Sequence, residues 1–167
     1  MNRFFFNFSK NIFENIIVKF NIEMNIIILQ GPNLNLLGLK SVEDGDRLTL
    51  DKLNKKIRLY THSNDIRSKI LQTHKVYKAI NFLQRNRNWA DGILFIPMSW
   101  AKYQWTIKET LDLISIPAAF VFFDPPFDFG TPVSDSILDN KKSRSFSGSP
   151  IEACENALDY LKSMINL

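Results

Sequence analysis

The chain has 167 residues, 45% of them hydrophobic, which suits one compact domain with a sizeable core. The formal net charge of +4 indicates a lysine-rich surface and gives little support to nucleic-acid binding, so we expect no nucleic-acid partner. The single cysteine, Cys154, excludes an internal disulfide and a cysteine-based metal cluster and suits a reducing compartment. No apolar run approaches the roughly 20 residues that span a bilayer, so we expect no membrane association.

Residues 1–23 differ in composition from the rest of the chain. Six phenylalanines stand there among asparagines and three basic residues. Three interpretations remain open: an over-extended start in an A/T-rich gene, with Met24 as the true start; an organelle-targeting segment, which Glu14 and Glu23 weaken; and a genuine amphipathic helix. We therefore treat residues 1–23 as an extension that is dispensable for folding and residues 24–167 as one domain. The expected location is the cytoplasm, or an organelle if the extension is a transit peptide.

Strand and helix patterns alternate along the rest of the chain. Residues 26–30 are uncharged and rich in isoleucine, as in a strand covered on both faces. Apolar residues at helical spacing then predict helices around residues 50–60 and 76–83, with a short second strand at Ile70 and Leu71 between them. Such an order is typical of a parallel sheet with crossover helices.

The second half of the chain continues the alternation. Residues 93–96 predict a third strand, residues 105–113 a helix, and residues 118–123 a fourth strand that two prolines terminate. A fifth strand is expected near residues 144–148, where the pattern is weak and suits only a short or edge strand.

The last helix has the clearest start signal. Ser149-Pro150-Ile151-Glu152 combines a capping box with a proline at the first helical position, and apolar residues on one face continue to Ile165. Alternating elements of this length predict an α/β fold, a three-layer sandwich in which helices cover both faces of a parallel sheet of about five strands. We expect the flavodoxin-like strand order 2-1-3-4-5.

The most informative stretch follows the first strand and reads Gly31-Pro32-Asn33-Leu34-Asn35-Leu36-Leu37-Gly38. Gly31 and Pro32 end the strand and leave the Asn33 amide free to bond something other than backbone. This stretch resembles the opening signature of the type II 3-dehydroquinate dehydratases. The resemblance continues through Asp91-Gly92-Ile93, Ser115-Ile116-Pro117 and the final helix, so it spans roughly residues 25 to 165.

The resemblance implies the flavodoxin-like fold and a specific reaction, the dehydration of 3-dehydroquinate to 3-dehydroshikimate in the shikimate pathway. In the family a tyrosinate removes a proton next to a ketone, the enolate is stabilised, and a histidine assists loss of the tertiary hydroxyl. The tyrosine needs a basic neighbour, because its pKa must fall from about 10 toward neutrality. No metal and no organic cofactor take part, so none is expected here.

Most of the family's catalytic positions are substituted in this chain. The family has an arginine and a tyrosine in the loop after the signature, an asparagine and a histidine at the end of the third strand, and a glutamate and a histidine on the fourth. In the same order, this chain has Lys40, Gly45, Ile96, Lys102, Phe120 and Phe122. We therefore expect the dehydratase activity to be lost or greatly reduced. The alternative is a non-catalytic binding or scaffolding protein on the same fold.

Three loops should form one cleft at the carboxyl edge of the sheet, namely residues 31–41, 97–103 and 124–131. In doubly wound sheets ligands bind there, at the point where the strand order reverses. Phe120 and Phe122 share one side of their strand, so they either make one wall of the cleft apolar or belong to the core.

The candidate catalytic residues are Asn33, Lys40 and Lys102, and the candidate substrate-binding residues are Asn33, Lys102, Glu109 and Asp124. Lys102 is either a cation that binds a small-molecule carboxylate or a solvated loop lysine. Asn33 matches the signature asparagine, and its alternative role is to cap its own turn. His62 and His74 fall at none of the family's histidine positions, and two such separated residues do not predict a metal site.

The resemblance also implies a homo-oligomer, because members of the family form trimers that associate into dodecamers. Glu109 falls where the family has an aspartate that reaches a neighbouring subunit's site, although a glutamate on a helix also suits a solvated face. Trp100 and Trp105 could form subunit contacts near the cleft rim if they are interface anchors rather than core residues.

Overall fold

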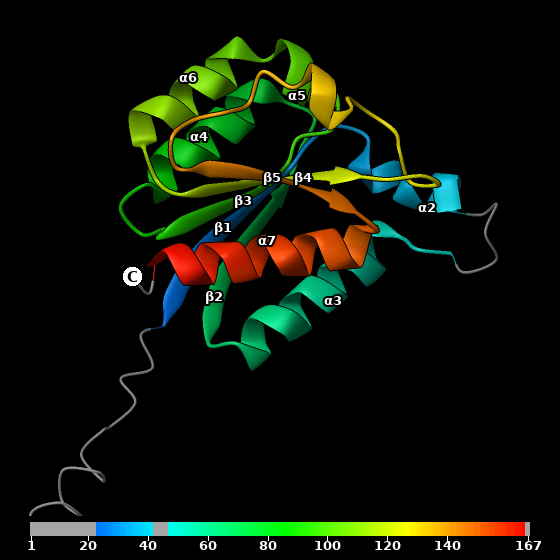
Figure 1. Ribbon diagram of the computed structural model, residues 1–167, viewed down its shortest axis with the longest axis horizontal. Coiled ribbons are helices and arrows are strands. Elements are labelled where there is room, and N and C mark those ends of the chain that lie inside the picture. Colours follow the sequence, from blue (N-terminus) through cyan, green and yellow to red (C-terminus); the bar gives the residue numbers. More distant parts are fainter. Residues whose placement is uncertain (1–22, 42–46, 166–167) are drawn as a thin grey trace, which may run out of the picture.

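Five parallel strands form the central sheet of the computed structural model, which describes residues 23–41 and 47–165 (Figure 1). The strands are β1 (Met24–Gln30), β2 (Ile66–Gln72), β3 (Gly92–Ile96), β4 (Ala118–Phe123) and β5 (Ser143–Gly148), in the order β2-β1-β3-β4-β5. The predicted flavodoxin-like strand order is confirmed. The predicted extension up to residue 22 and the Gly45 position lie outside the described residues.

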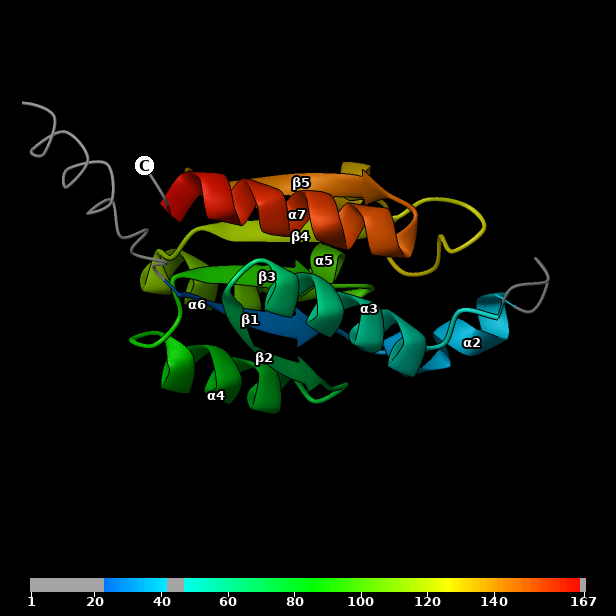
Figure 2. The ribbon, with the colours of Figure 1, turned by 90° about the horizontal axis from the view of Figure 1, so that it is seen from below.

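Helices cover both faces of the sheet (Figures 1 and 2). One face carries α3 (Leu50–Ser63) and α7 (Pro150–Ile165), and the opposite face carries α4 (Val76–Asn86), α5 (Trp100–Tyr103) and α6 (Trp105–Ile114). Three short elements complete the fold: the 3-10 helices η1 (Leu34–Leu36) and η3 (Val133–Asp135) and the single-turn helix α2 (Leu37–Lys40). No helix in the described part of the chain is long and apolar enough to cross a membrane.

The position of β1 inside the sheet explains why its sequence does not alternate between apolar and polar residues. Ile26 and Ile28 pack into the core layer beneath α3 and α7, whereas Ile27 and Leu29 pack into the layer beneath α4 and α6. All four side chains are fully buried, because β1 has a neighbouring strand on each side and a helix layer on each face.

The two edge strands explain the weak sequence patterns. β2 runs over seven residues, whereas the sequence predicted a strand at only two of them. The prediction was too short because Arg67 and Lys69, which lie exposed on the sheet edge, interrupt the apolar pattern. β5 pairs with β4 over its whole length from Ser143 to Gly148, although most of its side chains are exposed or half-buried. Backbone pairing with β4 therefore defines β5, and Phe146 adds a contact with α7, where its ring centroid lies 5.5 Å from that of Tyr160.

The bounds of α6 and the start of α7 agree with the predicted helices. α7 begins at Pro150, and the Ser149 hydroxyl donates a 3.4 Å hydrogen bond to Glu152 Oε2. The Ala153 N–H donates to the Ser149 carbonyl at 2.9 Å, which completes the first turn. Trp100 at the start of α5 is only 5% exposed and belongs to the core, so of the two alternatives left open for this tryptophan the structure supports the core residue.

Candidate ligand-binding pocket

The three loops predicted to converge do meet at the carboxyl edge of the sheet. The Gly31 N–H donates a 2.8 Å hydrogen bond to the Ile96 carbonyl, which joins the first loop to the end of β3. The Thr131 N–H donates to the Met98 carbonyl at 3.3 Å, and the Lys40 ammonium lies 4.0 Å from an Asp128 carboxylate oxygen. These contacts connect all three loops into one site.

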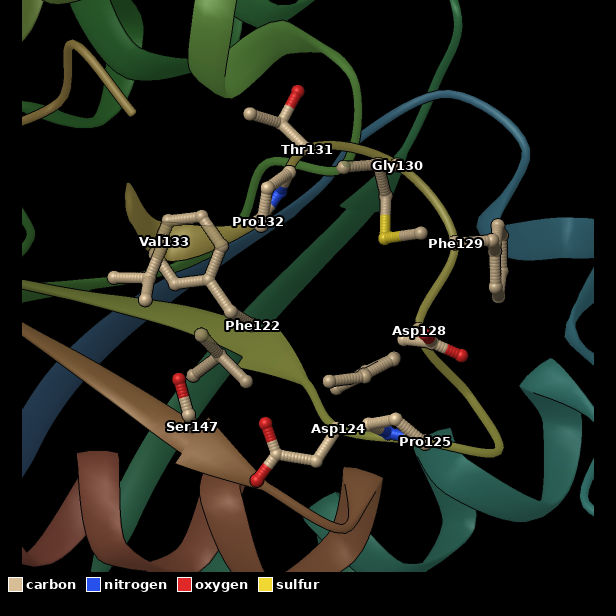
Figure 3. Close-up of a pocket in the computed structure, with 13 residues that line it drawn as sticks. Phe122, Asp124, Pro125, Asp128, Phe129, Gly130, Thr131, Pro132, Val133 and Ser147 are labelled. Atoms are coloured by element: carbon tan, nitrogen blue, oxygen red, sulfur yellow. The ribbon is translucent and has the colours of Figure 1, made fainter. Parts of the chain in front are cut away.

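A pocket of about 340 Å³ lies between the ends of β4 and β5 and the loop that follows β4 (Figure 3). Its apolar lining includes Met98, Val121, Phe122, Phe129, Pro132 and Val133. Its polar lining consists of Asp124, Asp128, Thr131 and Ser147. None of the described residues that line it is basic, so the lining offers two carboxylates and two hydroxyls on an apolar background.

The loop over this pocket is held close to the sheet by its glycine. Gly130 has a φ of 101°, a left-handed conformation, and a Cβ added there would lie 3.0 Å from the Met98 Cα. Met98 itself has a φ of 53°, which is uncommon for a residue with a long side chain. The close approach of Gly130 and Met98 fixes the roof of the pocket against the end of β3.

Phe120 and Phe122 occupy different environments. Phe120 is 1% exposed and packs edge-to-face on Phe95 with ring centroids 6.2 Å apart, so it belongs to the core and does not line the pocket. Phe122, two residues further along β4, is 6% exposed and forms a wall of the pocket (Figure 3). Both side chains belong to the core layer beneath α4 and α6, at the two positions where the resemblance implies polar groups, and only Phe122 also lines the pocket.

Both candidate lysines are engaged by aspartates of the loop after β4. Lys102 donates a 2.7 Å hydrogen bond to Asp135, and this bond raises the pKa of Lys102 and lowers the pKa of Asp135 from their ordinary values. Lys40 forms the longer 4.0 Å pair with Asp128. Neither lysine lines the pocket, so an anionic ligand would have to displace one of these aspartates to gain a cation.

The other candidate residues are scattered. Asn33 has a left-handed φ of 65° and an exposed side chain without a cap hydrogen bond, while its backbone carbonyl accepts from the Leu36 N–H at 2.8 Å. The side-chain cap that we considered for Asn33 is therefore absent. Glu109 lies exposed on α6 and does not line the pocket. Of the five candidates, the structure places only Asp124 in the pocket lining (Figure 3).

Met98, Phe129 and Thr131 lie in loops that we expected to form the cleft, but the sequence did not single them out as candidate residues. Phe129, Thr131 and Val133 lie in a loop whose only sequence signal is its glycine and prolines, and a loop of that composition is common. Met98 follows the Ile96-Pro97 pair that we compared with the family, but an isolated methionine carries no functional signal.

Other reactive groups lie away from this pocket. The Cys154 thiol is completely buried in α7, and burial raises its pKa, which makes it a poor nucleophile. Burial also raises the pKa of the Tyr60 phenol, which donates a short hydrogen bond to Asp159 between α3 and α7. His62 and His74 are exposed. Within residues 23–41 and 47–165, no group of three or more histidines, cysteines and acidic residues is arranged to hold a metal ion.

The fold and the pocket at the carboxyl edge define a doubly wound α/β protein of the flavodoxin-like class. The family model for dehydroquinase class II matches residues 24–161, so the chain belongs to that family. The resemblance found in the signature is thereby confirmed.

The relatives are distant and their alignments partial. The chain is 30% identical to a 3-dehydroquinate dehydratase of Clostridium botulinum strain 657 over 97 residues, 58% of this chain and 66% of the relative. It is also 30% identical to the 3-dehydroquinate dehydratase of Dictyoglomus turgidum over 88 residues, 53% of this chain and 61% of the relative. Each alignment thus covers less than two thirds of the relative's length.

Solved structures confirm the fold. The type II dehydroquinase of Butyrivibrio crossotus superposes with a TM-score of 0.67 at 21% identity, covering 84% of this chain and 99% of that one. A 3-dehydroquinate dehydratase-like protein of Bifidobacterium longum superposes with a TM-score of 0.62 at 12% identity, covering 86% of this chain and 99% of that one.

Proposed function

We propose that this chain binds a small molecule in the pocket beside β4 and has lost, or retains only a small remainder of, the dehydration of 3-dehydroquinate. The observation that carries the proposal is the environment of the two phenylalanines on β4. Phe120 and Phe122 are both buried in one core layer, and Phe122 also forms an apolar wall of the pocket, at the two positions where the family resemblance implies a glutamate and a histidine.

The remaining substitutions support the same conclusion. Lys40 and Lys102 stand at the family's arginine and histidine positions, and each is paired with an aspartate of its own chain. A lysine held in an ion pair is a poor substitute for a histidine that must donate a proton near neutral pH. Positioned acid and base groups each contribute about 10² to 10⁴ in rate, so losing several together should cost many powers of ten.

A divergent dehydratase is the second candidate function, and family membership together with Asn33 in the signature favours it. Tyr103 follows Lys102 and is 69% exposed, with the Lys102 ammonium 5.7 Å from its ring centroid. It is the nearest phenol to a family catalytic position. However, Tyr103 does not line the pocket, so it is poorly placed to act as the base on a ligand bound there.

We expect the purified protein to show no turnover of 3-dehydroquinate. The assay follows the absorbance of the enone product, with the Clostridium botulinum relative measured in parallel as the positive control. Ordinary enzymes turn over about 10 times per second, and we expect this chain to fall at least about 10⁴-fold lower. A rate within about a hundredfold of the control would overturn the proposal and support the divergent dehydratase.

We also propose that the protein forms a homo-oligomer through α6. Trp105 is 64% exposed, Leu113 is 79% exposed, and with Glu109 between them they follow one another at i, i+4 and i+8 along one exposed stripe. We expect a mass that is a multiple of the 19.4 kDa chain in light scattering. Large exposed aromatic residues are common interface anchors, so Trp105→Ala should shift the protein to smaller species.

The matched control for Trp105→Ala is Tyr77→Ala, because Tyr77 is 58% exposed on α4 and lies outside this stripe. Tyr77→Ala should leave the mass unchanged. A monodisperse monomer of the unmodified chain at micromolar concentration would contradict the oligomer and favour a small stand-alone binding domain.

A further inference from the structure

We infer that the pocket beside β4 takes a small organic cation, an alkylammonium or arylammonium, in preference to a carboxylate. The inference rests on the proposed function, because it treats the pocket as a binding site separated from the family's reaction. It names the chemical class of the ligand. The family resemblance alone would instead imply a carboxylate ligand.

The first argument is the state of the Asp124 carboxylate. Asp124 is exposed at the pocket edge, on the same side as Ser147 (Figure 3). Its backbone is fully used: the N–H donates to the Gly148 carbonyl and its own carbonyl accepts from the Phe127 N–H, both at 3.0 Å. Its side chain makes no hydrogen bond or ion pair with any described residue. A ligand cation would therefore meet a carboxylate that needs no prior release.

The second argument is the balance of charge around the pocket. Asp128 also lines it, and its partner Lys40 is 4.0 Å away and partly exposed. Lys102, which also contacts the segment after β4, donates a 2.7 Å hydrogen bond to Asp135. An entering carboxylate would have to compete with these aspartates for each lysine, and it would be repelled by Asp124.

The third argument is the apolar part of the lining. Phe122 and Phe129 contribute aromatic side chains to the lining, and Met98 adds a polarisable thioether. Aromatic faces attract cations through the ring quadrupole, and they also pack well against a flat hydrocarbon body. A volume of about 340 Å³ lies at the small end of ligand pockets, which suits a ligand of one ring and a short chain.

The test compares ligands that differ in charge but share a hydrocarbon body. Phenethylammonium and 3-phenylpropanoate are titrated into the full chain by calorimetry or NMR, with quinate as a carboxylate of the family's kind. We expect phenethylammonium to bind at least tenfold more tightly than either carboxylate. Asp124→Asn should weaken phenethylammonium binding about tenfold and leave or improve the binding of 3-phenylpropanoate.

Asp112→Asn is the control, because it removes one carboxylate from α6, outside the pocket lining, where Lys108 keeps Asp139 as its other partner, and it should leave both affinities unchanged. Thermal melting checks that both variants fold. Tighter binding of quinate or 3-phenylpropanoate, or no saturable binding of phenethylammonium at millimolar concentration, would overturn the inference. Neither result touches the proposed loss of activity, which only turnover of 3-dehydroquinate can overturn.

Discussion

Replacing Gly31 with alanine is expected to lower the melting temperature by about 6 to 12 °C. A Cβ at Gly31 would lie 2.3 Å from the Pro97 carbonyl oxygen and 2.8 Å from its carbonyl carbon, so it would meet backbone that cannot rotate away. Forcing β1 and β3 apart there would also stretch the hydrogen bond from Gly31 to Ile96. Overpacking costs up to about 3 kcal/mol, and each kcal/mol shifts a domain of this size by about 2 to 4 °C.

The control for this substitution is Gly38→Ala, measured by the same thermal unfolding monitored by circular dichroism. At Gly38 the nearest atom to an added Cβ is the Thr49 methyl carbon at 3.1 Å, which belongs to a side chain, and the residue lies in the short helix α2. We expect a change within about 3 °C, because the small crowding is offset by the better helix propensity of alanine. Equal effects of the two substitutions would contradict the steric explanation.

Introducing the glutamate that the family resemblance implies, with Phe120→Glu, is expected to destabilise the protein strongly rather than repair the site. The substitution removes a core phenylalanine, at about 3 to 5 kcal/mol, and buries an unpaired carboxylate, at about 3 kcal/mol or more. The sum of about 6 kcal/mol or more approaches the total stability of a typical domain, about 5 to 15 kcal/mol. We expect the melting temperature to fall by at least about 12 °C, or the protein to be recovered unfolded.

The pH dependence of the stability of Phe120→Glu tests whether the new carboxyl group is buried. Burial raises the pKa of a glutamate in the folded state above its unfolded value of about 4.3, so the folded state binds more protons and stability falls as the pH rises above 4.3. The uncharged Phe120→Gln variant lacks this dependence. If Phe120→Glu is recovered folded, the stability difference between the two variants in urea unfolding should therefore widen by up to about 1.4 kcal/mol per unit rise in pH.

Phe122→His is the positional control for Phe120→Glu. Phe122 is also buried but lines the pocket, so an imidazole there can form hydrogen bonds into the pocket, and we expect a loss of no more than about 3 kcal/mol. If Phe120→Glu were tolerated as well as Phe122→His, the assignment of Phe120 to the core would be wrong, and the proposed loss of function would lose its main support.

The fold could be predicted where each local pattern had a single physical cause. β1, β3 and β4 are buried on both faces, so their uncharged runs are visible without knowing their partners. The edge strands were harder, because Arg67 and Lys69 in β2 face solvent and β5 is held mainly by its backbone bonds to β4. The local composition of β5 does not show that β4 supplies its backbone hydrogen bonds.

The candidate site could be predicted only in outline. Strand order required the loops to converge, but it did not show that Lys40 and Lys102 would meet Asp128 and Asp135, since these pairs join residues distant in sequence. The sequence also could not separate Phe120 from Phe122, because a period of two puts both on the same side of β4. Which of the two phenylalanines reaches the pocket depends on how the surrounding helices and loops pack around the end of β4.

The placement of the pocket at an edge of the sheet affects how this protein can change over evolutionary time. Most of its lining comes from the loop after β4 and from the ends of β4 and β5, while β1 and β3 hold the centre of both core layers. Substitutions in a surface loop usually cost little stability. Selection could therefore alter what the pocket recognises while the central strands stay constant, and descendants with different ligands could share one unchanged scaffold.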